Sequence, residues 1–198
     1  MQLARAGFTR ITLAVNHLSR LIMAYFGDGS RLGVALDYSL EDQELSTIGP
    51  LTLIDDLPEN FLVMNGDILC NLDYRAFYEA HVTAGSRISV SAYRREVKID
   101  FGVLHYDQSG RLTEFQEKPV FDFDVSMGIY CINRSVIHAL PRGSVYGFDH
   151  LMSDGIARGE TIDIRPFSGY WLDIGRPDDY EYANEHFADL SARLGIAQ

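Results

Sequence analysis

Short apolar runs alternate with segments of helical periodicity along the first half of the chain. The runs occupy residues 11–15, 34–38, 61–64 and 88–92, and the helical segments occupy residues 19–26, 49–57 and 73–84. An apolar run of four or five residues is typical of a strand that is buried on both faces. Strands that alternate with helices predict an α/β fold, in which a parallel sheet is covered by helices on both of its faces.

The second half of the chain is richer in strands. Strands are predicted at residues 102–106, 111–116, 127–132, 161–167 and 170–174, and short helices at residues 135–140 and 148–158. The segment Asp107-Gln108-Ser109-Gly110 is typical of a hairpin turn between the first two of these strands. Pro177 favours the start of a final helix that we expect to reach about residue 194. Residues 1–6 are predicted to be the last part of a helix that ends at Gly7.

The composition fits one globular domain that comprises residues 1–198. Hydrophobic residues make up 46% of the chain and charged residues 23%, and neither a linker nor an internal repeat is visible. The net charge is -11 and no cluster of Lys and Arg occurs, which argues against a nucleic-acid-binding or membrane-binding module. Without a secretory signal or a long apolar stretch, the expected location is the cytoplasm. The sequence does not set the oligomeric state.

Asp67 is the first candidate for chemistry. It follows a strongly apolar predicted strand in the segment Asn65-Gly66-Asp67, and ligands of open α/β sheets bind outside the carboxyl ends of the strands. Gly66 would let a ligand approach the backbone closely. The alternative is that the segment is only a turn. Because an acidic protein needs a metal ion or locally placed donors to offset its repulsion of a phosphorylated ligand, carboxylates at this edge are candidate metal ligands.

Asp173 is the second candidate, at the end of a later predicted strand and two residues before Gly175. A carboxylate there can reach the same crevice as Asp67, and two carboxylates together with substrate phosphates are a common protein contribution to a Mg²⁺ site. Asp173 could instead stabilise the dipole of the helix that begins at Pro177, but Asp178 and Asp179 already occupy its first turn.

The segment Glu117-Lys118-Pro119 is the third candidate. A lysine is suited to a phosphate and a glutamate to sugar hydroxyls, although such a tripeptide alone is more often a solvated strand end. Together with other segments it resembles a known family. The segments that carry the resemblance, in order, are Asn65-Gly66-Asp67, Phe101-Gly102-Val103, Glu117-Lys118-Pro119, Met127-Gly128-Ile129-Tyr130 and Tyr170-Trp171-Leu172-Asp173-Ile174-Gly175. Their order and spacing are similar to those of the sugar-1-phosphate nucleotidyltransferases, which include mannose-1-phosphate guanylyltransferases and glucose-1-phosphate thymidylyltransferases.

The resemblance implies a Rossmann-like three-layer αβα fold with a mostly parallel, mixed sheet. It also implies the transfer of a nucleotidyl group from a nucleoside triphosphate to a sugar 1-phosphate, with release of pyrophosphate. The residues it implicates in catalysis are Asp67, Lys118 and Asp173, of which Asp67 and Asp173 would hold Mg²⁺. The residues it implicates in binding the sugar phosphate are Gly102, Glu117, Lys118 and Gly128.

The segment from Glu44 to Leu51 resembles the nucleotide-binding loop of the same family. The resemblance assigns nucleotide binding to Glu44, Thr47, Gly49 and Gly66. Two residues of the loop depart from the family pattern, because Ser46 replaces a glycine and Ile48 replaces an alanine. Serine carries a Cβ atom and adopts a positive φ at a higher cost than glycine does, so we expect an altered loop.

A larger departure lies at the N-terminus. The family opens with a strand and a glycine-rich loop that binds the triphosphate, and no segment before Gly7 matches them. The missing strand would be central in the sheet, so we expect that the sequence is a fragment. Because the backbone amides and cations that bind the triphosphate are missing, we also expect little or no transferase activity from the sequence as written. The alternative is a non-catalytic sugar-phosphate-binding or regulatory module. A dinucleotide-dependent oxidoreductase is disfavoured because no GxGxxG segment follows a strand.

Overall fold

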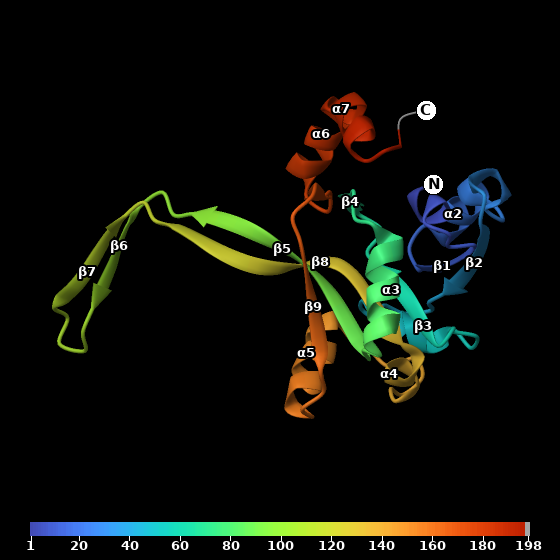
Figure 1. Ribbon diagram of the computed structural model, residues 1–198, viewed down its shortest axis with the longest axis horizontal. Coiled ribbons are helices and arrows are strands. Elements are labelled where there is room, and N and C mark those ends of the chain that lie inside the picture. The colour runs from blue at the N-terminus through green and yellow to red at the C-terminus, as the bar shows by residue number, and fades with distance from the viewer. Residues whose placement is uncertain (197–198) are drawn as a thin grey trace.

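The computed structural model describes residues 1–196 and consists of a body and a long β-ribbon arm (Figure 1). The chain begins with the short helix α1 (Gln2–Arg5) and continues into a βαβ unit. This unit contains β1 (Arg10–Val15), α2 (Ser19–Phe26), a 3-10 turn η1 (Ser30–Leu32) and β2 (Ala35–Leu40). Strands β1 and β2 pair in parallel, with Arg10 opposite Ala35 and Val15 opposite Leu40, so the βαβ prediction is confirmed.

A four-stranded sheet forms the centre of the body. Its strands lie in the order β3 (Asn60–Met64), β8 (Val120–Asn133), β5 (Ile88–Lys98) and β9 (Ile162–Phe167). β8 is antiparallel to both β3 and β5, and β5 is parallel to β9. Three of the four strands therefore run in one direction, as expected for a mostly parallel, mixed sheet. Within residues 1–196, β1 pairs only with β2, and β3 pairs only with β8. The β1–β2 pair is therefore separate from the four-stranded sheet.

Side chains of β8 alternate between two buried clusters on opposite faces of the sheet. Tyr130 and Ile132 point to one face, where they pack with α4 (Arg134–His138) and α5 (Phe148–Ala157). Ile129 and Cys131 point to the other face, where α3 (Tyr74–Ala84) supplies Tyr74 and Phe77. Because successive residues of a strand face opposite sides, one apolar run serves both clusters. The result is the expected three-layer αβα arrangement.

Several short elements differ from the predicted ones. The predicted helix at residues 49–57 is a 3-10 turn, η2 (Gly49–Leu53). The final helix is two helices, α6 (Pro177–Glu185) and α7 (Phe187–Arg193), which meet at His186. The strand β4 (Ile68–Cys70) was not predicted, and it pairs in antiparallel fashion with β10 (Trp171–Asp173).

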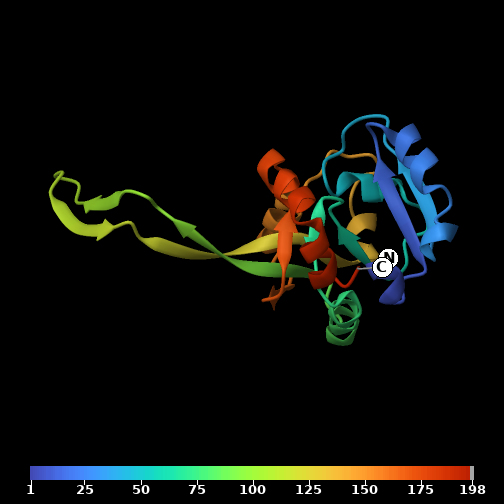
Figure 2. The same ribbon diagram turned by 90° about the horizontal axis from the view of Figure 1, so that it is seen from above.

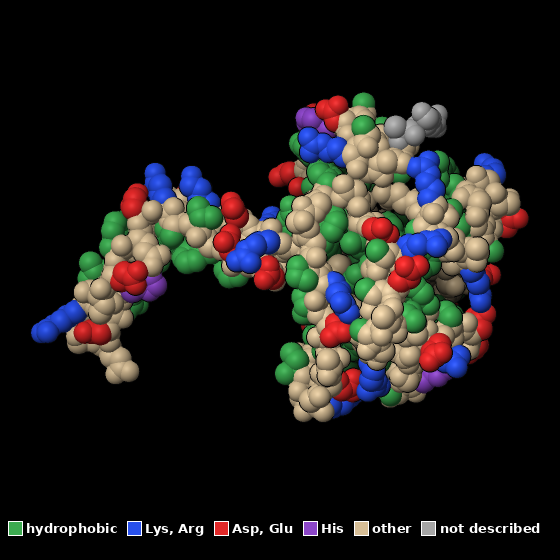
Figure 3. All heavy atoms as spheres, viewed as in Figure 1, with side chains coloured by type: hydrophobic (Ala, Val, Ile, Leu, Met, Phe, Trp, Pro, Cys, Tyr) green, Lys and Arg blue, Asp and Glu red, His purple; other side chains and the backbone are tan. Residues whose placement is uncertain are grey.

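The arm is the largest departure from the predicted elements. β5 and β8 continue as a two-stranded ribbon beyond the sheet, up to Lys98 and from Val120, and β6 (Gly102–Tyr106) and β7 (Leu112–Glu117) form the hairpin at its tip. The ribbon projects from the body in both views (Figures 1 and 2). Apolar side chains are visible along it in Figure 3, and Phe101 is 78% exposed.

Candidate metal and phosphate site

Strands β4 and β10 bring Asp67 and Asp173 together. Asp67 directly precedes β4 and Asp173 is the last residue of β10, where it lies opposite Ile68. The pairing continues one residue further, because the backbone N–H of Ile174 donates a hydrogen bond to the carbonyl oxygen of Asp67 at 2.9 Å. The two carboxylates are thus held at the same end of a short β-ladder, although they are 106 positions apart in the sequence.

Gly175 lies beneath both carboxylates. A Cβ atom placed on Gly175 would be 3.0 Å from Asp173 Oδ1 and 3.0 Å from Asp67 Oδ2, so the two oxygens border the same small volume. The backbone N–H of Gly175 also donates a 2.9 Å hydrogen bond to Asp173 Oδ1, which orients that carboxylate. Only a residue without a side chain leaves this volume open.

The pair fits Mg²⁺ better than a metal that needs a closed protein site. Among residues 1–196, no group of three or more His, Cys, Asp and Glu side chains could hold a metal ion. Mg²⁺ keeps several waters and is commonly bound through one or two carboxylates together with the phosphates of a substrate. Asp67 and Asp173 supply this kind of incomplete, oxygen-only ligand set.

A cavity of about 240 Å³ opens beside Asp173, where the arm leaves the body. It is lined by Tyr93 and Arg95 of β5, Trp171 and Asp173 of β10, and Arg176 and Asp179 at the start of α6. The rings of Tyr93 and Trp171 lie 5.3 Å apart with an interplanar angle of 37°. The indole Nε1–H of Trp171 donates to the carbonyl oxygen of Met127 at 3.1 Å, which fixes the ring against β8.

The loop around Ser46 is held by the segment that precedes α5. The backbone N–H groups of Ile48 and Gly49 both donate to the carbonyl oxygen of Tyr146, at 3.0 and 2.8 Å. Thr47 Oγ1 accepts a 2.9 Å hydrogen bond from the backbone N–H of Phe148. Burial and a hydrogen bond to Asp154 raise the pKa of the Tyr146 phenol to about 12, so the phenol stays protonated.

Two residues of this loop have special backbone requirements. Ser46 has a φ of 64°, which is the left-handed conformation that glycine adopts most easily, at the position where the resemblance expects glycine. A Cβ atom on Gly49 would lie 2.3 Å from the carbonyl oxygen of Ser144, so this position requires glycine. Glu44 and Thr47 are exposed and remain accessible to a ligand.

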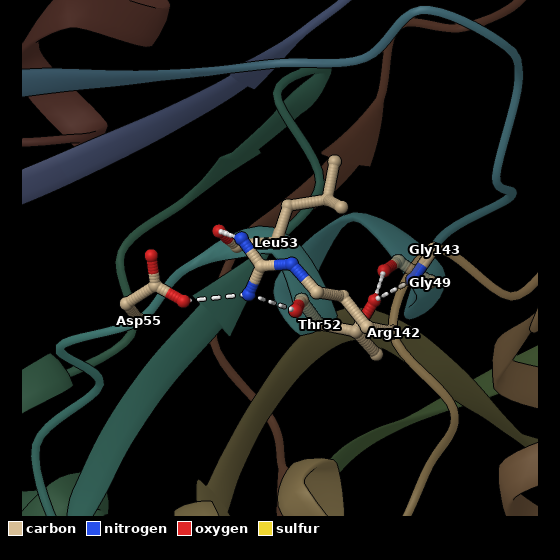
Figure 4. A network of polar contacts seen from close by, with 6 residues as sticks. All are labelled: Gly49, Thr52, Leu53, Asp55, Arg142 and Gly143. Carbon is tan, nitrogen blue, oxygen red and sulfur yellow. Dashed lines mark hydrogen bonds and ion pairs between the residues drawn. The ribbon is translucent and has the colours of Figure 1, made fainter.

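A polar network that the sequence analysis did not single out supports η2 (Figure 4). Arg142 donates to the carbonyl oxygens of Thr52 and Leu53 at 3.3 and 3.1 Å, and to Asp55 at 2.6 Å. The Thr52 hydroxyl donates to the carbonyl oxygen of Gly49 at 2.6 Å. The only feature of the sequence that could have pointed to this network is the arginine before a glycine in Arg142-Gly143. That feature does not reveal that the arginine binds backbone carbonyl groups some 90 positions away.

The structure divides the residues predicted to bind the sugar phosphate. Gly128 lies beside the Asp67 turn, because its carbonyl oxygen accepts a 2.9 Å hydrogen bond from the Asn65 N–H. Gly66, in the same turn, has open space around its Cα atom. In contrast, Gly102 and Glu117 face each other in the β6–β7 hairpin, and Lys118 follows them on the arm with a φ of 45°. The β6–β7 hairpin projects away from the body, which contains β4 (Figures 1 and 2).

Comparison with known proteins places the chain in a family. Residues 1–189 match the family model described as nucleotidyl transferase. The chain therefore belongs to the nucleotidyl transferase family, and the resemblance to sugar-1-phosphate nucleotidyltransferases is confirmed.

The relatives with curated descriptions act on sugar phosphates by name. The chain is 28% identical over 185 residues to the mannose-1-phosphate guanylyltransferase catalytic subunit beta of Drosophila pseudoobscura pseudoobscura, with 90% of this chain and 50% of the relative covered. It is 30% identical over 203 residues to the UTP–glucose-1-phosphate uridylyltransferase of Synechocystis, with 90% of this chain and 51% of the relative covered. The chain thus spans about half the length of the curated relatives it matches.

Solved structures confirm the fold. HddC from Yersinia pseudotuberculosis superimposes with a TM-score of 0.70 at 23% identity, over 94% of this chain and 82% of that chain. A putative glucose-1-phosphate thymidylyltransferase from Bacillus anthracis gives a TM-score of 0.69 at 20% identity, over 93% and 78% of the two chains. None of the helices described within residues 1–196 is long and apolar enough to cross a membrane.

Proposed function

We propose that this chain provides the metal- and sugar-phosphate-binding part of a sugar-1-phosphate nucleotidyltransferase. In the proposed reaction, a phosphate oxygen of the sugar 1-phosphate attacks the α-phosphorus of a nucleoside triphosphate. A new P–O bond forms, the bond to the β-phosphate oxygen breaks, and pyrophosphate leaves. The observation that carries the proposal is the convergence of Asp67 and Asp173 above Gly175 in a member of this family.

Asp67 and Asp173 would hold Mg²⁺ through their facing oxygens. Bound Mg²⁺ would offset the negative charge of the phosphates between which the nucleotidyl group moves. Asp173 is kept in place by the Gly175 N–H, and Asp67 is kept in register by the Ile174 N–H. Catalysis of this kind needs positioning and charge compensation and uses no covalent protein nucleophile.

The family resemblance also suggests roles for residues near the nucleotide and the sugar. By this resemblance, Thr47 and Gly49 would line the base pocket, with Glu44 and Gly66 near the nucleotide. The hydrogen bonds of the loop to residues 146–148 would keep it in place. Gly128 would present its backbone to the sugar from its place beside the Asp67 turn. Glu117 and Lys118 would reach the sugar phosphate only if the arm bends toward the body.

The test combines metal binding with turnover, using protein expressed from the longest open reading frame that contains this chain. Mn²⁺ binding is followed by electron paramagnetic resonance, and pyrophosphate release is measured with Mg²⁺, four nucleoside triphosphates, and glucose 1-phosphate or mannose 1-phosphate. We expect one metal site that is lost in Asp67→Asn and in Asp173→Asn, with at least a 100-fold loss of turnover in each.

Asp100→Asn is the matched control, since it removes an exposed carboxylate on the arm that pairs with Lys98. Metal binding or turnover that survives substitution of either carboxylate of the pair would refute the proposed site. Metal binding without pyrophosphate release from any substrate pair would overturn the proposed activity and favour a non-catalytic binding module.

A further inference from the structure

Two arginine side chains without partners face the cavity beside Asp173. Arg95 projects from β5 and Arg176 precedes the first turn of α6, and both line the cavity. Among residues 1–196, neither guanidinium group has a carboxylate within 4 Å or a hydrogen-bond partner. Both residues are exposed, and a guanidinium group is always charged and carries five N–H donors, so the two side chains can offer donors to an anion at the rim of the cavity.

The neighbouring Arg94 shows what a structural arginine does on the same strand. Its guanidinium group lies 3.8 Å from Asp122 and 3.7 Å from Asp124, on the cross-strand neighbours along β8. Because successive residues of a strand point to opposite faces, Arg94 and Arg95 cannot share these partners. Arg95 lies opposite Phe123 in the register, so β8 supplies no directly facing carboxylate for it.

The wall of the cavity suits a sugar ring. Trp171 and Tyr93 present two aromatic rings beside the two guanidinium groups, and the hydrogen bond to Met127 keeps the indole in place. An aromatic face with nearby polar groups is a common arrangement in small-ligand sites. The volume of about 240 Å³ is below the roughly 300–1,000 Å³ of pockets for drug-sized ligands, so a hexose phosphate fits it better than a whole nucleoside triphosphate.

Asp173 connects this cavity to the proposed metal site. Its carboxylate borders the small volume at Gly175 that Asp67 also borders, and Asp173 is one of the residues that line the cavity. A phosphate held by the two arginines would therefore lie next to the metal carboxylates. Asp173 and Asp179 would repel a phosphate dianion, and the two guanidinium charges offset this repulsion.

We propose that Arg95 and Arg176 bind the phosphate group of a sugar phosphate in this cavity, with Trp171 and Tyr93 against the sugar ring. This inference rests on the proposed function for the choice of ligand. It places the sugar phosphate at the root of the arm, and it requires no movement of the hairpin that carries Glu117 and Lys118.

Isothermal titration calorimetry in EDTA tests the inference without nucleotide or turnover. The probes are glucose 1-phosphate, mannose 1-phosphate, inorganic phosphate and glucose, and the proteins are the wild type, Arg95→Gln, Arg176→Gln and the control Arg94→Gln. Because both arginine side chains are exposed, loss of one guanidinium charge should weaken sugar-phosphate binding roughly twofold to fivefold in the first two variants. Arg94→Gln should bind like the wild type, and glucose alone should bind at least tenfold more weakly than its phosphate.

The outcomes separate this inference from the proposed function. Wild-type protein that binds neither sugar phosphate, or arginine variants that bind as well as Arg94→Gln, would overturn it, even if pyrophosphate release is observed. Binding of glucose 1-phosphate no tighter than that of inorganic phosphate would overturn the role of the aromatic wall. Arginine-dependent sugar-phosphate binding in a protein without transferase activity would support the site while refuting the activity.

Discussion

Substituting Gly175 by alanine should separate the function of the carboxylate pair from the stability of the fold. The added Cβ atom would lie 3.0 Å from one oxygen of Asp67 and 3.0 Å from one oxygen of Asp173. This distance is a few tenths of an ångström below a comfortable contact of about 3.5 Å, so at least one carboxylate must rotate. The change acts directly where the two oxygens face each other.

The expected loss is in metal affinity. Mg²⁺ and Mn²⁺ sites depend on well-placed oxygens, and changes next to metal ligands commonly cost about 10–100-fold in affinity. We therefore expect Gly175→Ala to weaken Mn²⁺ binding at least roughly tenfold, which is about 1.4 kcal/mol. The free energy of unfolding should change by less than about 1 kcal/mol, because Gly175 has no positive φ and alanine restricts the unfolded chain.

The assay is electron paramagnetic resonance of Mn²⁺ with mannose 1-phosphate present, together with urea unfolding of the same samples. Asp178→Asn is the control, since it removes a nearby exposed carboxylate from the first turn of α6 without changing the pair. If Gly175→Ala bound Mn²⁺ as tightly as the wild type, or if Asp178→Asn lost as much affinity, the reasoning from the shared volume would be wrong.

Three further predictions concern stability, each measured by urea unfolding. Ser46→Gly should raise the free energy of unfolding by roughly 0.5–1 kcal/mol, because it removes the cost of about 1–2 kcal/mol of a left-handed backbone at a non-glycine residue while it adds conformational entropy to the unfolded chain. Gly49→Ala should lower the free energy of unfolding by about 1–3 kcal/mol, because the added Cβ atom clashes with the carbonyl oxygen of Ser144. Equal changes in the two variants would contradict both predictions. Arg142→Met should lower the free energy of unfolding by about 1 kcal/mol, because the carbonyl groups of Thr52 and Leu53 lose their hydrogen-bond donor. Asp55→Asn should lower it by less than about 0.5 kcal/mol, because the ion pair between Arg142 and Asp55 is exposed. A larger loss in Asp55→Asn than in Arg142→Met would refute this order. His81 is fully buried, and desolvation lowers the pKa of its imidazole from the ordinary value of 6.5. As the pH falls, this imidazole is therefore protonated at a higher pH in the unfolded state than in the folded state, and the free energy of unfolding should fall as the pH drops below about 6.5. His81→Gln should remove part of that pH dependence.

Much of the body follows from local patterns. The helix at residues 19–26 and the strands near residues 61–64 and 162–167 are predictable because apolar periodicity and capping residues act over a few neighbours. β4 escaped prediction because three residues carry no period, and it exists only through its pairing with β10. The break at His186 was missed for a similar reason, since the apolar pattern continues across it.

The arm illustrates a different limit. The predicted strands at residues 88–92 and 127–132 coincide with the parts of β5 and β8 that are buried in the sheet. The extension of β8 alternates apolar and charged residues, as in Phe121, Asp122, Phe123 and Asp124, but within residues 1–196 the arm has no third strand to bury the apolar face. A pattern that marks a half-buried strand therefore did not reveal a ribbon that leaves the body.

For the candidate site, the sequence by itself indicated the family through the order and spacing of five short segments, and the α/β class through local apolar patterns. It also named Asp67 and Asp173 as candidate metal ligands. Only the tertiary structure decided that Asp67 and Asp173 share the volume above Gly175, that Arg95 and Arg176 face one cavity, and that Glu117 and Lys118 lie on the arm. The physical reason is that these relations depend on strand register and on chain direction between segments up to about a hundred residues apart, and no local preference encodes either of them.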